Sequence, residues 1–394
     1  MININKNIII EYIFLFFICF PYLTYFQSRS DIAPYAVVFL TIIFLLIKKK
    51  SLPTELWTLF ILFLLSIISL ILNFNYLAFL LLAGYFSIFI IAASTYFILR
   101  LNNRVNFKLI NFFFYIWFIV GLVQTFVNND FMTSVLTRHS TSPDRGVIGL
   151  AAEPSFYAST MLFFLIINYI NNFRPLITFV LTFLSIVFFA KSITGFFILC
   201  IFIIFFFLFS FRVKTFLFTY LFIALLIFLT LKTNILVDTR LFDLMLKFLN
   251  DPIMTFVNDE SANSRIASIV SAFVASKNYY FLINPFNDFS EQTSIIYDKY
   301  SYYIHPYTFN QIADRTMSGT GQAFFNIGIF SILYYFIIYR LSSKCFKSKK
   351  KALYLSLCLF VLMTTAIPYT FPIFGFIFGL LAFKARIEIS EKLK

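Results

Sequence analysis

Apolar runs about as long as a bilayer is thick dominate this sequence, and short polar segments separate them. A transmembrane helix needs about 20 mostly apolar residues. Only 12% of the residues are charged, against about 25% in soluble domains, so lipid must be the solvent for most of this surface. We interpret twelve runs as spans, near 8–26, 32–47, 55–73, 76–99, 107–128, 154–171, 175–190, 194–211, 215–232, 321–339, 352–367 and 370–384.

Basic residues are concentrated in alternate connecting segments. If the amino terminus is cytoplasmic, the inner segments hold 20 of the 31 Lys and Arg residues but 4 of the 17 Asp and Glu residues. An excess of Lys and Arg marks cytoplasmic loops, so both termini are predicted to be cytoplasmic. The net charge of +14 is therefore a topology signal. A nucleic-acid partner, the usual explanation of such a charge in a soluble protein, is not expected.

The predicted fold class is an all-α polytopic membrane protein of about 12 transmembrane helices, with one large extracytoplasmic loop containing short amphipathic helices. Residues 1–232 form an amino-terminal transmembrane bundle of about nine spans. Residues 233–320 form the large loop, and residues 321–394 form the last spans and a cytoplasmic tail. Within the loop, 238–250 suits a helix in the membrane interface, and the apolar spacing over 266–274 predicts a second amphipathic helix.

Cysteine positions and nucleotide motifs exclude several classes of protein. Three cysteines fall inside predicted spans and the fourth falls in a predicted cytoplasmic segment, so neither a disulfide framework nor metal-ligand spacing is present. The sequence has no P-loop, which argues against an ATP-driven pump. Neither a metal nor another cofactor is expected.

Charged residues at the outer ends of the predicted spans are the candidates for chemistry, because polar groups beside apolar spans are expensive. Pro154 suits the first helical position of the sixth span and leaves Glu153 as its N-cap. The Glu153 carboxylate could serve a site or only cap the helix. Arg145, in the same polar segment, is either a site residue or a solvated loop charge. Lys191, between two long apolar runs, could belong to the same site or only snorkel to the interface.

The large loop carries further candidates. Asn263 and Ser264 suit the N-cap of the second amphipathic helix, which would place Arg265 in its first turn. A cation there opposes the helix dipole unless an anion such as phosphate or pyrophosphate binds, although an ordinary surface arginine remains the alternative. Arg315 precedes the glycine-rich segment 318–321. His305 lies among many tyrosines, which fit either a membrane interface or a sugar-binding surface.

Several of these segments resemble Wzy-type O-antigen and capsule polysaccharide polymerases. Arg145-Gly146, with Gly149 and 153–155 (Glu-Pro-Ser), is similar to that family's arginine–glycine stretch. The turn 191–195 (Lys-Ser-Ile-Thr-Gly) is similar to the family's Ser-x-Thr-Gly segment, and Ser264-Arg265 is similar to its loop arginine. The segment 318–329 is similar to the one that leads into a late span of the family. The resemblance covers roughly residues 8–385. The related O-antigen ligases usually have a His-Asn pair where this chain has 318–321, which favours a polymerase over a ligase.

The resemblance implies a membrane glycosyltransferase of the bacterial inner membrane. Its substrate would be an undecaprenyl-pyrophosphate-linked oligosaccharide, with membrane lipid and a chain-length regulator protein as further partners. Arg145, Arg265, Arg315 and Lys191 would bind the pyrophosphate. Glu153 would act as the base, with His305 in reserve. A ligase is the nearest alternative, and a lipid-linked oligosaccharide flippase is a transporter alternative, against which a loop of about ninety residues argues.

Overall fold

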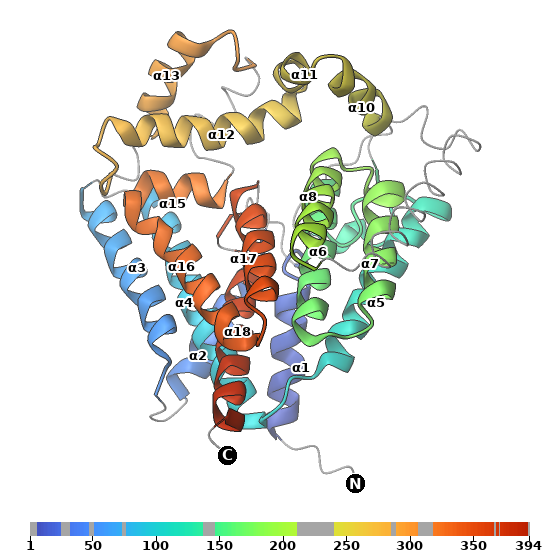
Figure 1. Ribbon diagram of the computed structural model, residues 1–394, viewed down its shortest axis with the longest axis vertical. Coiled ribbons are helices and arrows are strands. Elements are labelled where there is room, and N and C mark those ends of the chain that lie inside the picture. Colours follow the sequence, from blue (N-terminus) through green and yellow to red (C-terminus); the bar gives the residue numbers. More distant parts are fainter. Residues whose placement is uncertain are drawn as a thin grey trace.

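The computed structural model describes residues 6–24, 32–46, 51–72, 76–136, 146–210, 240–284, 289–305, 318–365, 368–369 and 371–392. Within these ranges the regular structure is helical, apart from one isolated antiparallel β-bridge between Leu23 and Leu136. Figure 1 shows two layers, a bundle of steep helices and a cap of helices lying across one end of it. The first described helix begins, and the last one ends, at the end of the bundle opposite the cap (Figure 1).

Helices of the bundle lie at eleven of the twelve positions predicted as spans, and the twelfth, 215–232, falls outside the described residues. Four segments, Thr54–Leu72, Leu81–Asn102, Phe107–Phe126 and Gly319–Cys345, are long and apolar enough to cross a membrane. The prediction of an all-α membrane protein is confirmed at this level. The continuous helices of the bundle are α1 (Lys6–Cys19), α2 (Tyr35–Leu46), α3 (Thr54–Leu72), α4 (Tyr76–Asn102), α5 (Phe107–Phe126), α6 (Pro154–Asn171), α7 (Pro175–Leu184), α8 (Ile193–Ser210), α16 (Ile332–Cys345), α17 (Lys349–Thr364) and α18 (Pro372–Lys392).

Helix α4 lies at the centre of one half of the bundle, packed against α2, α3 and α18. Its contact with α18 is close because α18 presents glycines. A Cβ atom at Gly379 would lie 2.4 Å from the Ala92 carbonyl oxygen, and one at Gly375 would lie 2.7 Å from the Ile91 Cβ. Small residues of this kind allow helix backbones to approach each other in lipid, where no hydrophobic effect drives helices together.

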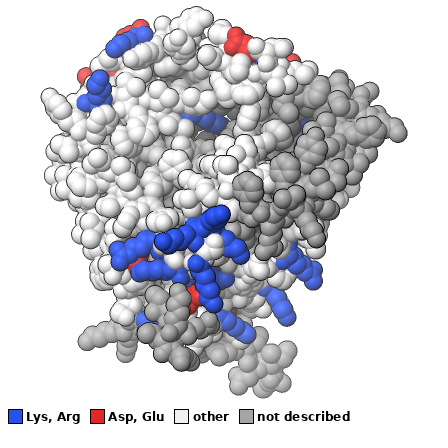
Figure 2. Space-filling model, in the orientation of Figure 1, with Lys and Arg blue, Asp and Glu red and all other residues white. Residues whose placement is uncertain are grey.

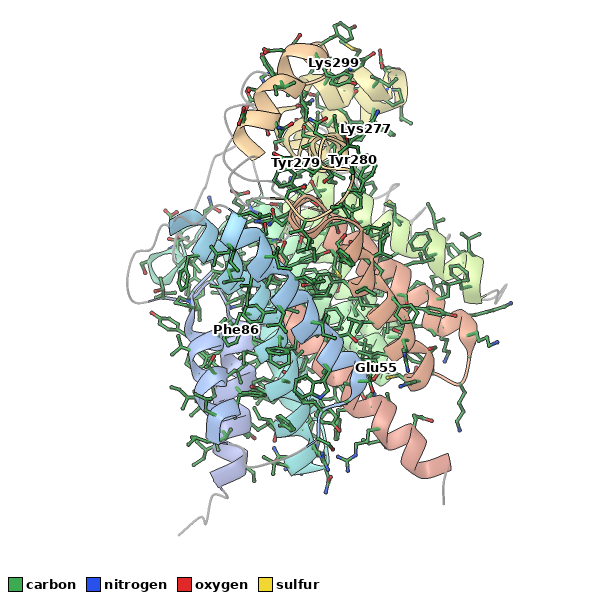
Figure 3. All side chains as sticks on the ribbon, turned by 90° about the vertical axis from the view of Figure 1, so that its left-hand side faces the viewer. Glu55, Phe86, Lys277, Tyr279, Tyr280 and Lys299 are labelled. Carbon is green, nitrogen blue, oxygen red and sulfur yellow. The ribbon has the colours of Figure 1, made fainter. Side chains whose placement is uncertain are left out.

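The cap consists of α10 (Arg240–Asn250), α11 (Pro252–Asn258), α12 (Glu260–Lys277) and α13 (Phe289–Tyr300). The helices predicted for 238–250 and around 266–274 are therefore present. The cap contacts the rest of the protein through aromatic rings, where Phe197 of α8 meets Phe248 and Phe256 at 5.2 and 6.2 Å between centroids. It also packs along α12 against α15. Figure 3 shows Lys277, Tyr279, Tyr280 and Lys299 at the cap end and Glu55 toward the opposite end.

The span predicted at 321–339 lies within Gly319–Cys345, which is long and apolar enough to cross a membrane, but its helix is not continuous, because the chain bends at Gly328. Helix α15 (Gly319–Ile327) lies under α12, a 3₁₀ turn η3 (Gly328–Ser331) follows, and α16 then descends through the bundle (Figure 1). Gly328 has φ 58° and ψ −139°, a backbone conformation that glycine adopts without steric cost and that other residues largely avoid. A Cβ atom there would lie 2.1 Å from the Phe281 carbonyl oxygen, which also accepts a hydrogen bond from the Ile329 N–H at 3.0 Å.

The bend predicts that Gly328→Ala destabilises the fold. This backbone conformation costs an L-residue about 1–3 kcal/mol, and the added methyl also meets the Phe281 carbonyl. We expect a melting temperature in detergent several degrees below wild type. Ile329→Ala, which truncates an exposed neighbour, is the control and should melt near wild type. Equal melting temperatures for Gly328→Ala and wild type would show that the bend is not fixed by this contact.

Candidate functional site

The segment between Gly146 and the start of α6 is buried without being helical. Ile148, Leu150, Ala151 and Ala152 are each buried among the bundle helices. Non-helical backbone at membrane depth is tolerated only where protein surrounds it and satisfies its polar groups. Here the Ala151 N–H bonds to the Ile148 carbonyl at 3.0 Å, and partners on other helices satisfy further groups.

The main partner is the Gln124 side chain on α5, a residue that the sequence reasoning missed. Its Oε1 accepts the Gly149 N–H at 2.7 Å, and its Nε2 donates to the Gly149 and Phe131 carbonyl oxygens, both at 2.8 Å. Gly149 has φ 59°, and a Cβ atom there would lie 2.7 Å from the Tyr157 ring. The signal in the sequence was an amide within an apolar span, where a polar side chain needs a partner.

The segment also packs against the end of a distant helix. A Cβ atom at Gly146 would lie 2.1 Å from the Ala190 carbonyl oxygen, and the Val147 N–H donates to the Phe189 carbonyl at 2.8 Å. Ala190 immediately precedes Lys191. The arginine–glycine segment and the 191–195 turn, some forty-five residues apart in the sequence, are therefore neighbours in space.

Lys191 occupies a strained position. It follows η2 (Ser185–Ala190), a π-helical turn that ends α7, and π-helical turns occur frequently at functional sites. Lys191 has φ 46° and ψ 37°, which is uncommon for a residue other than glycine. Its side chain is half-buried. After it, Ser192 Oγ accepts the Gly195 N–H at 3.2 Å, which starts α8.

Glu153 is the N-cap of α6 by backbone, as predicted, with Pro154 at the first helical position. Its carbonyl oxygen accepts the N–H groups of Phe156 and Tyr157 at 3.0 and 3.1 Å. The side chain makes no capping hydrogen bond, so the interpretation of the carboxylate as only a cap is not supported. Glu153 is half-buried. Two residues further on, Ser155 Oγ is buried and has no hydrogen-bond partner among the described residues.

The predicted cap of α12 is wrong. The helix begins at Glu260, so Asn263 and Ser264 lie inside it and Arg265 lies in its second turn. Asn263 uses its side chain for tertiary bonds instead: Nδ2 donates to the Tyr303 carbonyl at 2.9 Å, and Oδ1 accepts the His305 N–H at 3.0 Å. The half-buried His305 therefore lies close to the turn of α12 that carries Arg265.

Arg265 lies near a different helix amino terminus from the one predicted. On α12 it shares a face with Ser268, Ala272 and Ser276, at helical spacings of three, seven and eleven residues. That face contacts α15: a Cβ atom at Gly321 would lie 3.3 Å from both the Ser268 carbonyl and the Ala272 Cβ. Arg265 lies one turn before this contact, on the side of the amino-terminal end of α15. Such an end favours an anion.

Two of the predicted site residues, Arg145 and Arg315, lie outside the described residues. The nearest described residues of the two segments are Gly146 and Ser318. Gly146 lies beside Ala190, and Ser318 caps α15, where its Oγ accepts the Gly321 N–H at 3.1 Å. Figure 2 shows basic side-chain atoms within a hollow between the cap and the bundle. The structure thus places Lys191 beside the buried segment 146–153, and Arg265 on the face of α12 that contacts α15, whereas His305 bonds to Asn263.

A cluster of hydroxyl groups under the cap was also missed. Thr320 Oγ1 is hydrogen-bonded to the Tyr335 hydroxyl and lies 3.4 Å from Thr364 Oγ1, and the Tyr335 and Tyr369 hydroxyls are 3.3 Å apart. These residues come from α15, α16, α17 and the turn before α18. The cluster therefore joins the cap-proximal ends of three helices. No local pattern in the sequence indicates it, because its members are far apart along the chain.

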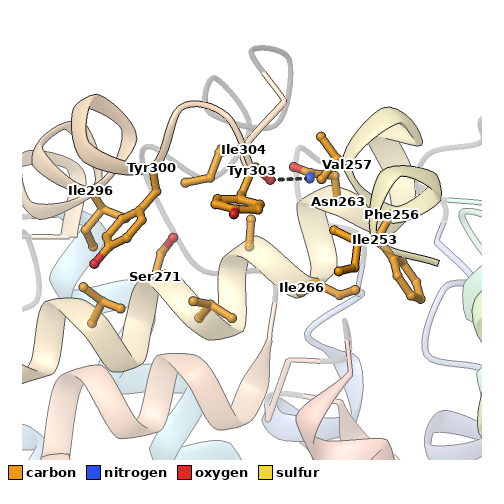
Figure 4. A pocket seen from close by; sticks show the side chains of 13 residues that line it. Ile253, Phe256, Val257, Asn263, Ile266, Ser271, Ile296, Tyr300, Tyr303 and Ile304 are labelled. Atoms are coloured by element: carbon orange, nitrogen blue, oxygen red, sulfur yellow. Dashed lines mark hydrogen bonds between the residues drawn. The ribbon is translucent and has the colours of Figure 1, made fainter. Parts of the chain in front are cut away.

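A pocket of about 520 Å³ lies within the cap, on the other face of α12 (Figure 4). This volume is within the range of about 300–1,000 Å³ typical of small-molecule sites. Ile266, Val270 and Val274 of α12 form its floor, and Tyr300 and Tyr303 lie across from them. Because Arg265 is on the opposite face of the same helix, this pocket is separate from the candidate site.

Comparisons with protein-family models, with curated proteins and with solved structures find no match to this chain. Among the described residues, no group of three or more His, Cys, Asp and Glu side chains is placed to hold a metal ion.

The hydrogen bonds between Gln124 and Gly149 predict that Gln124→Met destabilises the bundle. Methionine fills a similar volume but leaves the buried N–H and carbonyl of Gly149 without partners, at a cost of about 1–3 kcal/mol for each such group. We expect a lower melting temperature in detergent. Thr125→Val is the control, because Thr125 Oγ1 donates only to the Gly121 carbonyl of its own helix. If both variants melt together, Gln124 does not hold the segment.

Proposed function

We propose that this chain is a polysaccharide polymerase, which joins undecaprenyl-pyrophosphate-linked oligosaccharide units into O-antigen or capsular polysaccharide. In this proposal it crosses the bacterial inner membrane about twelve times, with both termini in the cytoplasm and the cap in the periplasm. The observation that carries the proposal is the contact of Gly146 with Ala190. This contact unites the arginine–glycine segment, the start of α6 and the 191–195 turn, which are the segments that resemble the polymerase family.

The distribution of charge supports the orientation. The described part of the cap, 240–284 and 289–305, contains five basic and six acidic residues. The opposite end of the bundle carries a dense band of basic atoms (Figure 2). Because cytoplasmic segments are enriched in Lys and Arg, the cap belongs on the periplasmic side, where lipid-linked sugar donors are presented and nucleotide sugars are not.

The proposed reaction uses acid–base and electrostatic catalysis. A hydroxyl of the fresh unit attacks the anomeric carbon of the growing chain, its proton passes to the Glu153 carboxylate, and the bond to undecaprenyl pyrophosphate breaks. Arg265 at the amino-terminal end of α15, with Lys191, Arg145 and Arg315, would stabilise the negative charge on the leaving pyrophosphate. His305 is the reserve base. The hydroxyls of Thr320 and Tyr335 line the neighbouring helix ends, where sugar hydroxyls would arrive.

The phenotype of a deletion strain separates this proposal from its alternatives. Loss of a polymerase leaves single repeat units that are still exported and ligated, so the lipopolysaccharide ladder should show core carrying one unit. Loss of a ligase or of a flippase should leave bare core. The measurement is a silver-stained gel of lipopolysaccharide from the deletion strain, and a bare-core pattern would contradict the proposal.

Single substitutions test the assigned residues. Arg265→Ala and Glu153→Gln should each abolish long chains at normal protein levels, because removing one charge-stabilising group typically costs about 100-fold in rate. The matched controls are Lys277→Ala, at the other end of α12, and Glu291→Gln, an exposed acid on α13. Both controls should give a wild-type ladder. A wild-type ladder from Arg265→Ala or Glu153→Gln would remove that residue from the site.

A further inference from the structure

A band of basic side chains lies at the end of the bundle away from the cap. It comprises residues of α16, of α17 and of the turn between them, and Figure 2 shows basic atoms gathered there. The lysines of the turn and of α17 are exposed, and Arg340 and Lys344 are 49% and 35% exposed. Six cations lie close together along the chain, so their mutual repulsion needs compensation. The basic band consists of Arg340, Lys344, Lys347, Lys349, Lys350 and Lys351.

Glu55 is the carboxylate that the described residues place against this band. It lies in the first turn of α3 and is only 4% exposed. Its Oε1 lies 2.9 Å from Arg340 Nε and also pairs with Lys344. One carboxylate fixes these two cations, one helical turn apart on α16, and still leaves their outer parts exposed. Glu55 therefore fixes the positions of Arg340 and Lys344 but leaves the basic band with a net positive charge.

The three lysines that begin α17 increase the excess of positive charge in the basic band. Lys349, Lys350 and Lys351 form the first turn of that helix, which contains no acidic residue, and the N-cap Ser348 makes no side-chain capping bond. Cations at a helix amino terminus oppose the helix dipole. An anionic group at this place would interact favourably with the lysines and with the first-turn N–H groups together.

The surrounding surface shows which anion the band meets. On α3 the exposed side chains of Trp57, Ile61 and Leu64 form one stripe, and on α16 those of Ile332, Phe336 and Tyr339 form another. The spacing of four and then three residues puts each stripe on one helix face. Both stripes face outward as lipid-facing surfaces do, and α3 and α16 pack against each other.

Each stripe ends in an aromatic residue beside the basic band. Trp57 is two residues from Glu55, and Tyr339 adjoins Arg340. Exposed Trp and Tyr side chains favour the level of the lipid headgroups. The acyl chains of a phospholipid can therefore lie along the stripes of α3 and α16 while its phosphate reaches Arg340, Lys344 and the lysines of α17.

We propose that the basic band is a binding site for the headgroup of an anionic phospholipid, in the leaflet away from the cap. Basic pockets at helix ends recognise such headgroups. The site is distinct from the candidate catalytic site and does not depend on the proposed function. A zwitterionic lipid would bind more weakly, because the same cations would repel its ammonium group.

The test measures lipid binding to the full-length chain, purified in a zwitterionic detergent, by native mass spectrometry. Phosphatidylglycerol should bind more tightly than phosphatidylcholine. In the variant Lys349→Gln/Lys350→Gln/Lys351→Gln, affinity for phosphatidylglycerol should fall by at least about tenfold, since each basic residue near an anionic headgroup contributes substantially to binding. These lysines are exposed, so the variant should keep the wild-type melting temperature without added lipid.

The matched control removes three exposed basic residues from the same end of the bundle but outside the band, Lys108→Gln/Arg174→Gln/Arg386→Gln. It should bind phosphatidylglycerol like wild type. An equal loss in both triple variants would mean that net charge alone matters, and would overturn the site. Equal binding of the two lipids, or unchanged affinity in the lysine variant, would also overturn it. Displacement of the lipid by excess inorganic phosphate would identify a free-anion site instead.

Discussion

The buried non-helical backbone between Gly146 and Glu153 depends on hydrogen bonds from two other helices, and the candidate site depends on that backbone. Gln124 satisfies both polar groups of Gly149, and the Phe189 carbonyl accepts the Val147 N–H. An unpaired backbone group in an apolar environment costs several kcal/mol. The segment therefore has one favourable position, and this position sets where Glu153 begins α6 and where Gly146 meets Ala190, the residue before Lys191.

Most of the helical positions could be predicted from the sequence, because span length and apolar composition are local properties. The N-cap position of Glu153 was also predictable, since Pro154 restricts the residue before it. The start of α12 was not. Asn263 and Ser264 have good capping side chains, but Asn263 bonds to Tyr303 and His305 instead. A tertiary contact forty residues away overrode the local preference for a cap.

The bend at Gly328 and the hydroxyl cluster were beyond prediction for the same reason. An apolar segment with one internal glycine is compatible with a continuous helix, and only the approach of the Phe281 carbonyl makes the positive φ at Gly328 necessary. Tyr335 and Tyr369 come together through the packing of α16 and α18. Gln124 was the exception, because an amide within an apolar span is visible in the sequence even when its partner is not.

Helix α12 links the two layers because its faces have different compositions. Ser268, Ala272 and Gly321 are small, so α12 and α15 approach closely, as small residues permit wherever helices pack tightly. This approach holds Arg265 at the amino-terminal end of α15 and beneath the cap, where partial exclusion of water strengthens its interaction with an anion. A larger residue at any of these three positions would separate the two helices and move Arg265 with α12. The packing of small side chains, as much as the arginine itself, therefore determines where the positive charge lies.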